Sequence, residues 1–160
     1  MRKFKMRILH LSNKKFILHS LFWGLCLSIV LGMISGMINE ESLRIDFLEK
    51  KGLLEIFLLT VIAGPLIETL IFQYVVIETG LKIIDKQKNF ILILVSALVF
   101  GISHFYSFLY VSLAFILGIY FGCIYVLSKE KEGINAFILV TIVHANINFC
   151  AFIIEDVMKL

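Results

Sequence analysis

Five long apolar segments alternate with short charged ones along the chain, and this alternation predicts the fold. The apolar segments are residues 16–38, 53–81, 90–106, 108–127 and 134–154. A helix needs about 20 apolar residues to cross a bilayer, so each segment is long enough, or nearly so, to span it. Almost no polar residue separates the third segment from the fourth, which predicts a tight hairpin near Ser107. We therefore expect an all-α, polytopic membrane helical bundle with about five transmembrane helices.

The overall composition agrees with a membrane location. Of the 160 residues, 60% are hydrophobic and 17% are charged, and the mean hydropathy is +0.98. A soluble domain is about half apolar and a quarter charged. Residues 16–160 are predicted to form a single transmembrane domain, preceded by a basic cytoplasmic arm at 1–15. The three cysteines lie singly in different apolar segments, which favours buried thiols over a disulfide framework.

The basic residues gather on one predicted side of the membrane. Six of the fifteen Lys and Arg residues precede the first apolar segment. If all five segments cross, eleven of the fifteen lie on the same side as this arm, and the positive-inside rule makes that side cytoplasmic. We expect the N-terminus inside and the C-terminus outside. The arm is explained by topology and lipid headgroups, so no nucleic-acid partner is expected.

Three of the apolar segments carry polar side chains that are costly in a bilayer. They are Glu68 in the second, His104 in the third, and His144 with Asn148 in the fifth. An ionisable side chain there costs at least ~2.5 kcal/mol on insertion scales and usually faces protein groups at a functional site. At ~1.5 Å per helical residue, all four lie roughly 18 to 24 Å from the cytoplasmic loops, which would bring them to one depth. Pro65, one turn before Glu68, predicts a kink.

The spacing of these residues favours one catalytic pocket. His144 and Asn148 are four residues apart and share a helix face, and Phe100 and His104 have the same spacing. A carboxylate, two imidazoles and an amide in a low-dielectric pocket are the groups needed to activate a water and stabilise an oxyanion. Alternatively, Glu68, His104 and His144 could hold a divalent metal such as zinc, although their spacing is not diagnostic.

Residues 53–149 resemble the CPBP family of membrane proteins, the CaaX proteases and bacteriocin-processing enzymes, also called the Abi family. The family carries EExxxR, FxxxH and HxxxN/D in this order on separate helices. The chain has ETLIFQ at 68–73, FGISH at 100–104 and HANIN at 144–148. The second and third motifs match in full. In the first motif Thr69 replaces a glutamate and Gln73 replaces the arginine, so we expect these two to form a neutral hydrogen-bonding pair.

The resemblance implies an intramembrane endopeptidase of the glutamic or metal-dependent kind, with its core at 53–154. By resemblance, Glu68 and His104 activate water, while His144 and Asn148 stabilise the oxyanion. The residues with a supporting role would be Thr69, Gln73 and Phe100. The implied substrate is a membrane-tethered or membrane-inserted peptide or protein, and no prenyl group is required.

Two other classes of function stay open at this point. The altered first motif supports an alternative hypothesis. In it, the protein is a catalytically silent relative that acts as a membrane scaffold or a bacteriocin self-immunity protein. A proton or ion carrier through Glu68 has less support, because no second carboxylate lies clearly within an apolar segment. The bias toward Ile, Lys, Phe and Asn favours a bacterial genome, and hence a location in the bacterial inner membrane.

Overall fold

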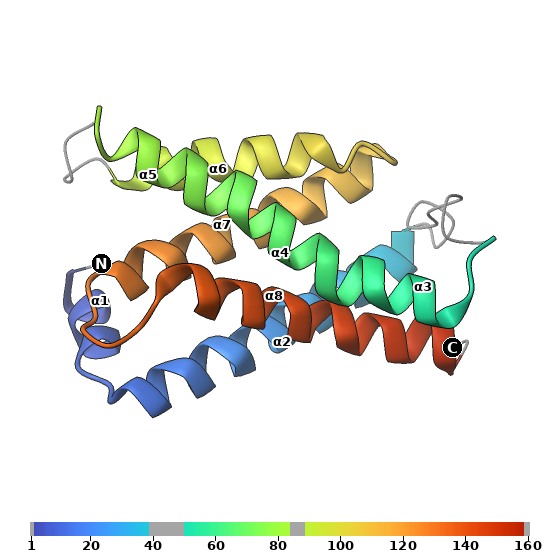
Figure 1. The fold of residues 1–160 in the computed structure, drawn as a ribbon, viewed down its shortest axis with the longest axis horizontal. Helices are drawn as coiled ribbons and strands as arrows, with labels where there is room; N and C mark the ends of the chain where they lie inside the picture. Colours follow the sequence, from blue (N-terminus) through green and yellow to red (C-terminus); the bar gives the residue numbers. More distant parts are fainter. Residues whose placement is uncertain (1, 39–49, 84–88, 159–160) are drawn as a thin grey trace.

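The computed structural model describes residues 2–38, 50–83 and 89–158, and in these ranges the chain folds into six helical rods joined by turns (Figure 1). Four of the rods are single α-helices: α1 (Arg2–Leu9), α2 (Asn13–Ile38), α6 (Asn89–Ser103) and α7 (Phe108–Lys129). A fifth rod consists of α8 (Ala136–Phe152) and the π-helix η5 (Ile153–Val157) that follows it. The described ranges contain no strand, which confirms the all-α prediction. The predicted loops at 39–49 and 84–88 lie outside the described residues.

The sixth rod is one long helix in which α and π segments alternate. It runs through α3 (Leu53–Phe57), η2 (Leu58–Ala63), α4 (Gly64–Glu68), η3 (Thr69–Val75) and α5 (Val76–Gly80), where η marks a π-helix. A π segment closes hydrogen bonds five residues apart, and such segments are frequent at functional sites. Both π segments lie beside α4. The residue expected to catalyse is therefore flanked by two stretches of widened helix.

Pro65 explains the first π segment and leaves one carbonyl without a backbone donor. The N–H of Gly64 donates to the carbonyl of Leu59, a five-residue step. The next donor in this register would be residue 65, but proline has no N–H. The carbonyl of Thr60 consequently needs a partner from elsewhere in the protein.

Four of the rods are long and apolar enough to cross a membrane. They are Asn13–Ile38, Leu53–Gly80, Phe108–Lys129 and Ala136–Val157. Helix α6, formed by the third predicted segment, is apolar but has only 15 residues. Among the described residues, the structure thus supports four of the five predicted spans by length. The chain is an integral membrane protein, and its orientation in the bilayer stays a prediction.

Helix α8 lies at the centre of the bundle, packed against α7, α2 and the long rod (Figure 1). Helices α6 and α7 form the predicted hairpin, and Ser107 caps the start of α7 by accepting a hydrogen bond from the Tyr110 N–H at 3.0 Å. Glycine allows the two helices to approach closely, since a Cβ added at Gly118 would lie 2.9 Å from the Cα of Ala97. The close packing of α6 on α7 fixes the position of the C-terminal end of α6 relative to α7.

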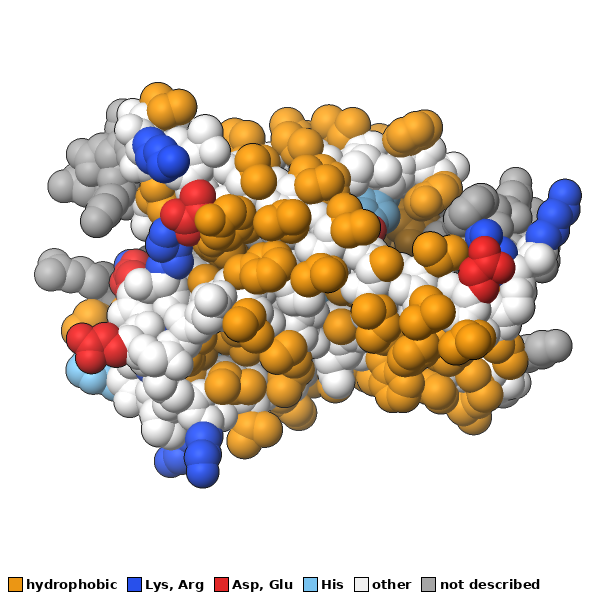
Figure 2. Space-filling model, viewed as in Figure 1, with side chains coloured by type: hydrophobic (Ala, Val, Ile, Leu, Met, Phe, Trp, Pro, Cys, Tyr) orange, Lys and Arg blue, Asp and Glu red, His pale blue; other side chains and the backbone are white. Residues whose placement is uncertain are grey.

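The surface has the charge distribution of a protein surrounded by lipid. Figure 2 shows hydrophobic side chains across the middle of the molecule and charged side chains gathered at its two ends. At one end, Lys5 pairs with Glu130 at 2.6 Å, and the Nζ of Lys131 donates to the carbonyls of Leu9 and Leu11. These contacts place the N-terminal arm and the α7–α8 turn at the same end, as the five predicted crossings require.

Candidate active site

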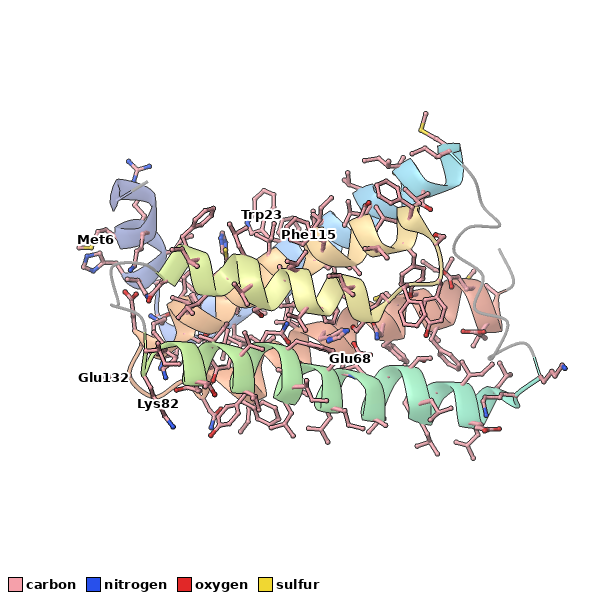
Figure 3. All side chains as sticks on the ribbon, turned by 90° about the horizontal axis from the view of Figure 1, so that it is seen from above. Met6, Trp23, Glu68, Lys82, Phe115 and Glu132 are labelled. Carbon is pink, nitrogen blue, oxygen red and sulfur yellow. The ribbon has the colours of Figure 1, made fainter. Side chains whose placement is uncertain are left out.

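The carboxylate of Glu68 lies between two imidazoles that come from other helices. Its Oε2 is 3.7 Å from the Nε2 of His104 and 3.6 Å from the Nε2 of His144. Glu68 is the last residue of α4, His104 follows the last residue of α6, and His144 lies in the middle of α8. Figure 3 shows Glu68 pointing from the long rod toward the helices opposite. The structure thus brings together three of the four side chains that the sequence predicted to lie at one depth.

The three side chains differ in their access to the outside. The exposed fraction of the side chain is 28% for Glu68, 16% for His104 and 5% for His144. On the face seen in Figure 2, a histidine and an acidic side chain are recessed between hydrophobic side chains, away from the charged ends. Glu68 and His104 are thus more accessible from outside the bundle than His144.

The ring of His104 is fixed by its own helix. Its Nδ1 lies 2.8 Å from the carbonyl of Phe100 and 3.1 Å from the Oγ of Ser103. Because a carbonyl can only accept, Nδ1 carries a proton, and in the neutral ring Nε2 is the bare nitrogen. That nitrogen faces the carboxylate of Glu68. Phe100 also packs its ring on the imidazole, with centroids 4.5 Å apart, so the supporting position predicted for Phe100 has a structural basis.

The ring of His144 is fixed by aromatic packing. It stacks on Phe121 at 4.6 Å between centroids and meets the edge of Phe100 at 5.8 Å. Its Nδ1 is buried and has no hydrogen-bond partner. A protonated Nδ1 in this position would be a buried donor without an acceptor, which is unfavourable. This favours the tautomer that carries its proton on Nε2, facing Glu68.

Asn148 satisfies the carbonyl that Pro65 leaves without a partner. The Nδ2 of Asn148 donates to the carbonyl of Thr60 at 2.8 Å, on the same rod as Glu68. One of the two amide hydrogens is therefore used to join α8 to the long rod, and the other is available to a ligand. The structure gives Asn148 a positioning contact that its motif did not reveal.

The pairing predicted for Thr69 and Gln73 is wrong. Both side chains are fully buried, and neither the Thr69 hydroxyl nor the two amide atoms of Gln73 have a hydrogen-bond partner. Both positions lie in the π segment η3, and their shared burial does not bring the hydroxyl and the amide into hydrogen-bonding contact. Each such buried group costs about 1 to 3 kcal/mol relative to a paired one.

The predicted zinc ligands do not fit a metal site in this arrangement. Within the described ranges, no group of three or more His, Cys, Asp or Glu side chains is placed to hold a metal ion. A metal-bound histidine also hydrogen-bonds through its second nitrogen, and the Nδ1 of His144 has no such partner. The chemistry of the site is therefore derived from the side chains alone.

Sequence reasoning missed one polar residue of the site. The ring of Tyr110, in the first turn of α7, stacks on His104 with centroids 5.8 Å apart and an interplanar angle of 9°. His104 is the residue whose Nε2 lies 3.7 Å from the carboxylate of Glu68. The tight hairpin was the available signal, because it folds the first turn of α7 back beside the residue that ends α6.

A half-buried glutamate facing two histidines inside a bundle of apolar helices defines a class of integral membrane protein with a polar centre. The model of the Rce1-like family, described as type II CAAX prenyl endopeptidase Rce1-like, matches residues 50–150. The chain belongs to this family, which confirms the resemblance carried by its motifs. No curated protein and no solved structure matched the chain.

Proposed function

We propose that the protein is an intramembrane endopeptidase that hydrolyses a peptide bond of a membrane-associated protein or peptide. The observation that carries this proposal is the carboxylate of Glu68 beside the Nε2 atoms of His104 and His144. Membership of a family of CAAX prenyl endopeptidases supports the same reaction. The proposal does not require a prenyl group on the substrate.

Glu68 and His104 activate the attacking water in this mechanism. The bare Nε2 of His104 and the Oε2 of Glu68 are both acceptors, and 3.7 Å between them exceeds a direct hydrogen bond. A water beside both atoms donates to them, loses one proton to the pair and forms a bond to the carbonyl carbon. The pair then gives the proton to the amine nitrogen as the C–N bond breaks.

His144 and Asn148 stabilise the negative charge on the former carbonyl oxygen. The Nε2–H tautomer favoured for His144 supplies one donor in a largely desolvated position. The second amide hydrogen of Asn148 supplies another. Removing a single donor of this kind typically costs about 10² to 10³ in kcat.

The location of the site favours a substrate that is itself in or at the membrane. The recess is surrounded by hydrophobic side chains between the two charged ends of the molecule (Figure 2). A soluble peptide would have to leave water to reach it, whereas a segment already tethered to the bilayer would not. The substrate class proposed is therefore a membrane-tethered or membrane-inserted polypeptide.

The proposal is tested with the purified protein in lipid and a library of membrane-associated peptides, digested in ¹⁸O-labelled water. Mass spectrometry is expected to find new carboxyl ends carrying ¹⁸O with the wild type, and none with Glu68→Ala or His104→Ala. Glu78→Gln is the matched control, because Glu78 lies on the same rod but pairs with Lys129. Cleavage that persists in both site variants would disprove the assignment.

A second candidate is a catalytically silent relative that acts as a membrane scaffold or a bacteriocin self-immunity protein. The observation in its favour is that the first motif has lost two of its three charged residues, and their replacements, Thr69 and Gln73, make no side-chain hydrogen bond. This candidate predicts a cellular phenotype that survives substitution of the four catalytic positions. The peptidase proposal predicts that each substitution abolishes it.

A further inference from the structure

Tyr110 stands out because its ring lies on the proposed catalytic base. The rings of Tyr110 and His104 are nearly parallel, with centroids 5.8 Å apart, which is an offset stack. The ring is held from two sides. The Ser107 cap fixes the backbone of Tyr110 at the start of α7, and Tyr106 packs edge-on against it at 5.1 Å.

The hydroxyl of Tyr110 is available, unlike those of the other two buried or half-buried tyrosines in the described residues. Tyr120 donates its O–H to the carbonyl of Ser20 at 2.5 Å, and Tyr125 donates to Glu78 at 2.8 Å. Within the part of the chain that the structure describes, the O–H of Tyr110 has no protein acceptor. This hydroxyl can therefore donate a hydrogen bond to a ligand that lies beside His104.

The position of this donor relates it to the reacting atoms. The Tyr110 ring stacks on His104, whose Nε2 lies 3.7 Å from the Glu68 carboxylate at the centre of the site. The site also needs donors toward the substrate oxygen, because Asn148 has already committed one amide hydrogen to the carbonyl of Thr60. A neutral phenol is suited to this task, since it can donate without adding charge beside the glutamate.

We infer that Tyr110 is a further catalytic residue, whose phenol O–H donates a hydrogen bond to the oxygen of the scissile carbonyl as negative charge develops there. This inference rests on the proposed peptidase function. The bond is formed mainly in the transition state, so its loss lowers kcat more than it changes KM.

The test compares three variants in the peptide cleavage assay. Tyr110→Phe keeps the ring that stacks on His104 and removes only the hydroxyl, and kcat is expected to fall about 100-fold with little change in KM. Tyr106→Phe is the matched control, because this tyrosine touches Tyr110 but is 56% exposed, and it is expected to keep wild-type kcat. Tyr110→Leu removes the ring contact as well and is expected to be less active than Tyr110→Phe.

Wild-type kcat in Tyr110→Phe, with a loss only in Tyr110→Leu, would overturn the inference by reducing Tyr110 to a packing role. If Tyr110→Phe does not fold, 3-fluorotyrosine at position 110 decides, because it is a stronger donor of similar shape. An increase in kcat supports the inference, and an unchanged kcat overturns it. If the wild type and Glu68→Ala behave alike in every assay, the proposed function has failed. If the wild type cleaves the peptide, Glu68→Ala does not, and Tyr110→Phe has wild-type kcat, only the inference about Tyr110 has failed.

Discussion

The link between Pro65, Thr60 and Asn148 gives a prediction about stability that a double-mutant cycle can test. Asn148→Leu removes the donor to the Thr60 carbonyl at nearly constant side-chain volume and leaves that carbonyl unpaired. In the Pro65→Ala background, residue 65 regains an N–H that can reach the carbonyl of Thr60 in the five-residue register of η2. The loss of Asn148 should therefore cost less when residue 65 is alanine.

The expected coupling free energy between the two substitutions is that of the hydrogen bond from Asn148 to the Thr60 carbonyl. Hydrogen bonds between helices in membrane proteins average ≈0.6 kcal/mol in double-mutant cycles and reach ≈1.7 kcal/mol. Asn148 bonds a carbonyl that has no alternative partner, so we expect a coupling near the upper end, about 1 to 1.7 kcal/mol. The cycle cancels the effect of Pro65→Ala on the unfolded chain, because both single and double variants carry it.

The assay is the unfolding free energy in mixed detergent micelles, measured for the wild type, the two single variants and the double variant. Asn146→Leu, on the same helix, serves as the control and should cost the same in either background. Additive effects of Pro65→Ala and Asn148→Leu would refute the claim that Asn148 compensates for the proline.

Three further predictions concern the surroundings of Glu68. Gly64→Ala should destabilise the protein by about 1 to 3 kcal/mol, because the added Cβ would lie 2.9 Å from the carbonyl of Leu59, whereas Gly36→Ala, with nothing within 4 Å, should be tolerated in the same unfolding assay. Thr69→Val should stabilise the fold by about 1 kcal/mol, since it removes a buried hydroxyl without a partner at constant shape, and a lower unfolding free energy would contradict this. Cleavage should survive dialysis against a chelator, with no stoichiometric metal in the dialysed protein by elemental analysis; loss of activity restored by zinc would show that a metal takes part.

The helices and the meeting of the polar residues could be predicted from the sequence because each rests on a strong local signal. Apolar segments of spanning length set the rods within a few residues of their observed ends. An ionisable side chain in such a segment usually pairs with other polar groups inside the bundle, so Glu68, His104 and His144 were expected to face one another. The hairpin at Ser107 followed from the lack of polar residues between two apolar segments.

Other features of the site depend on contacts between helices that sequence spacing does not encode. Pro65 predicted a kink, whereas the rod has π segments on both sides of α4, which the spacing of its residues did not indicate. The misjudged pair, Thr69 and Gln73, depends on how each side chain is oriented in the packed bundle, which a four-residue spacing does not determine. Tyr110 belongs to no motif, and only the fold of the hairpin brings its ring onto His104.

The most direct test of the central claim is the turnover number of Glu68→Gln, measured on a cleaved peptide beside Glu78→Gln. Both variants remove one carboxylate from the same rod at similar size, and the two side chains are equally exposed at 28%. Because Glu68 is proposed to take the proton from the attacking water, kcat should fall about 10² to 10⁴-fold in Glu68→Gln and stay near the wild-type value in Glu78→Gln. Equal turnover by the two variants would contradict the account.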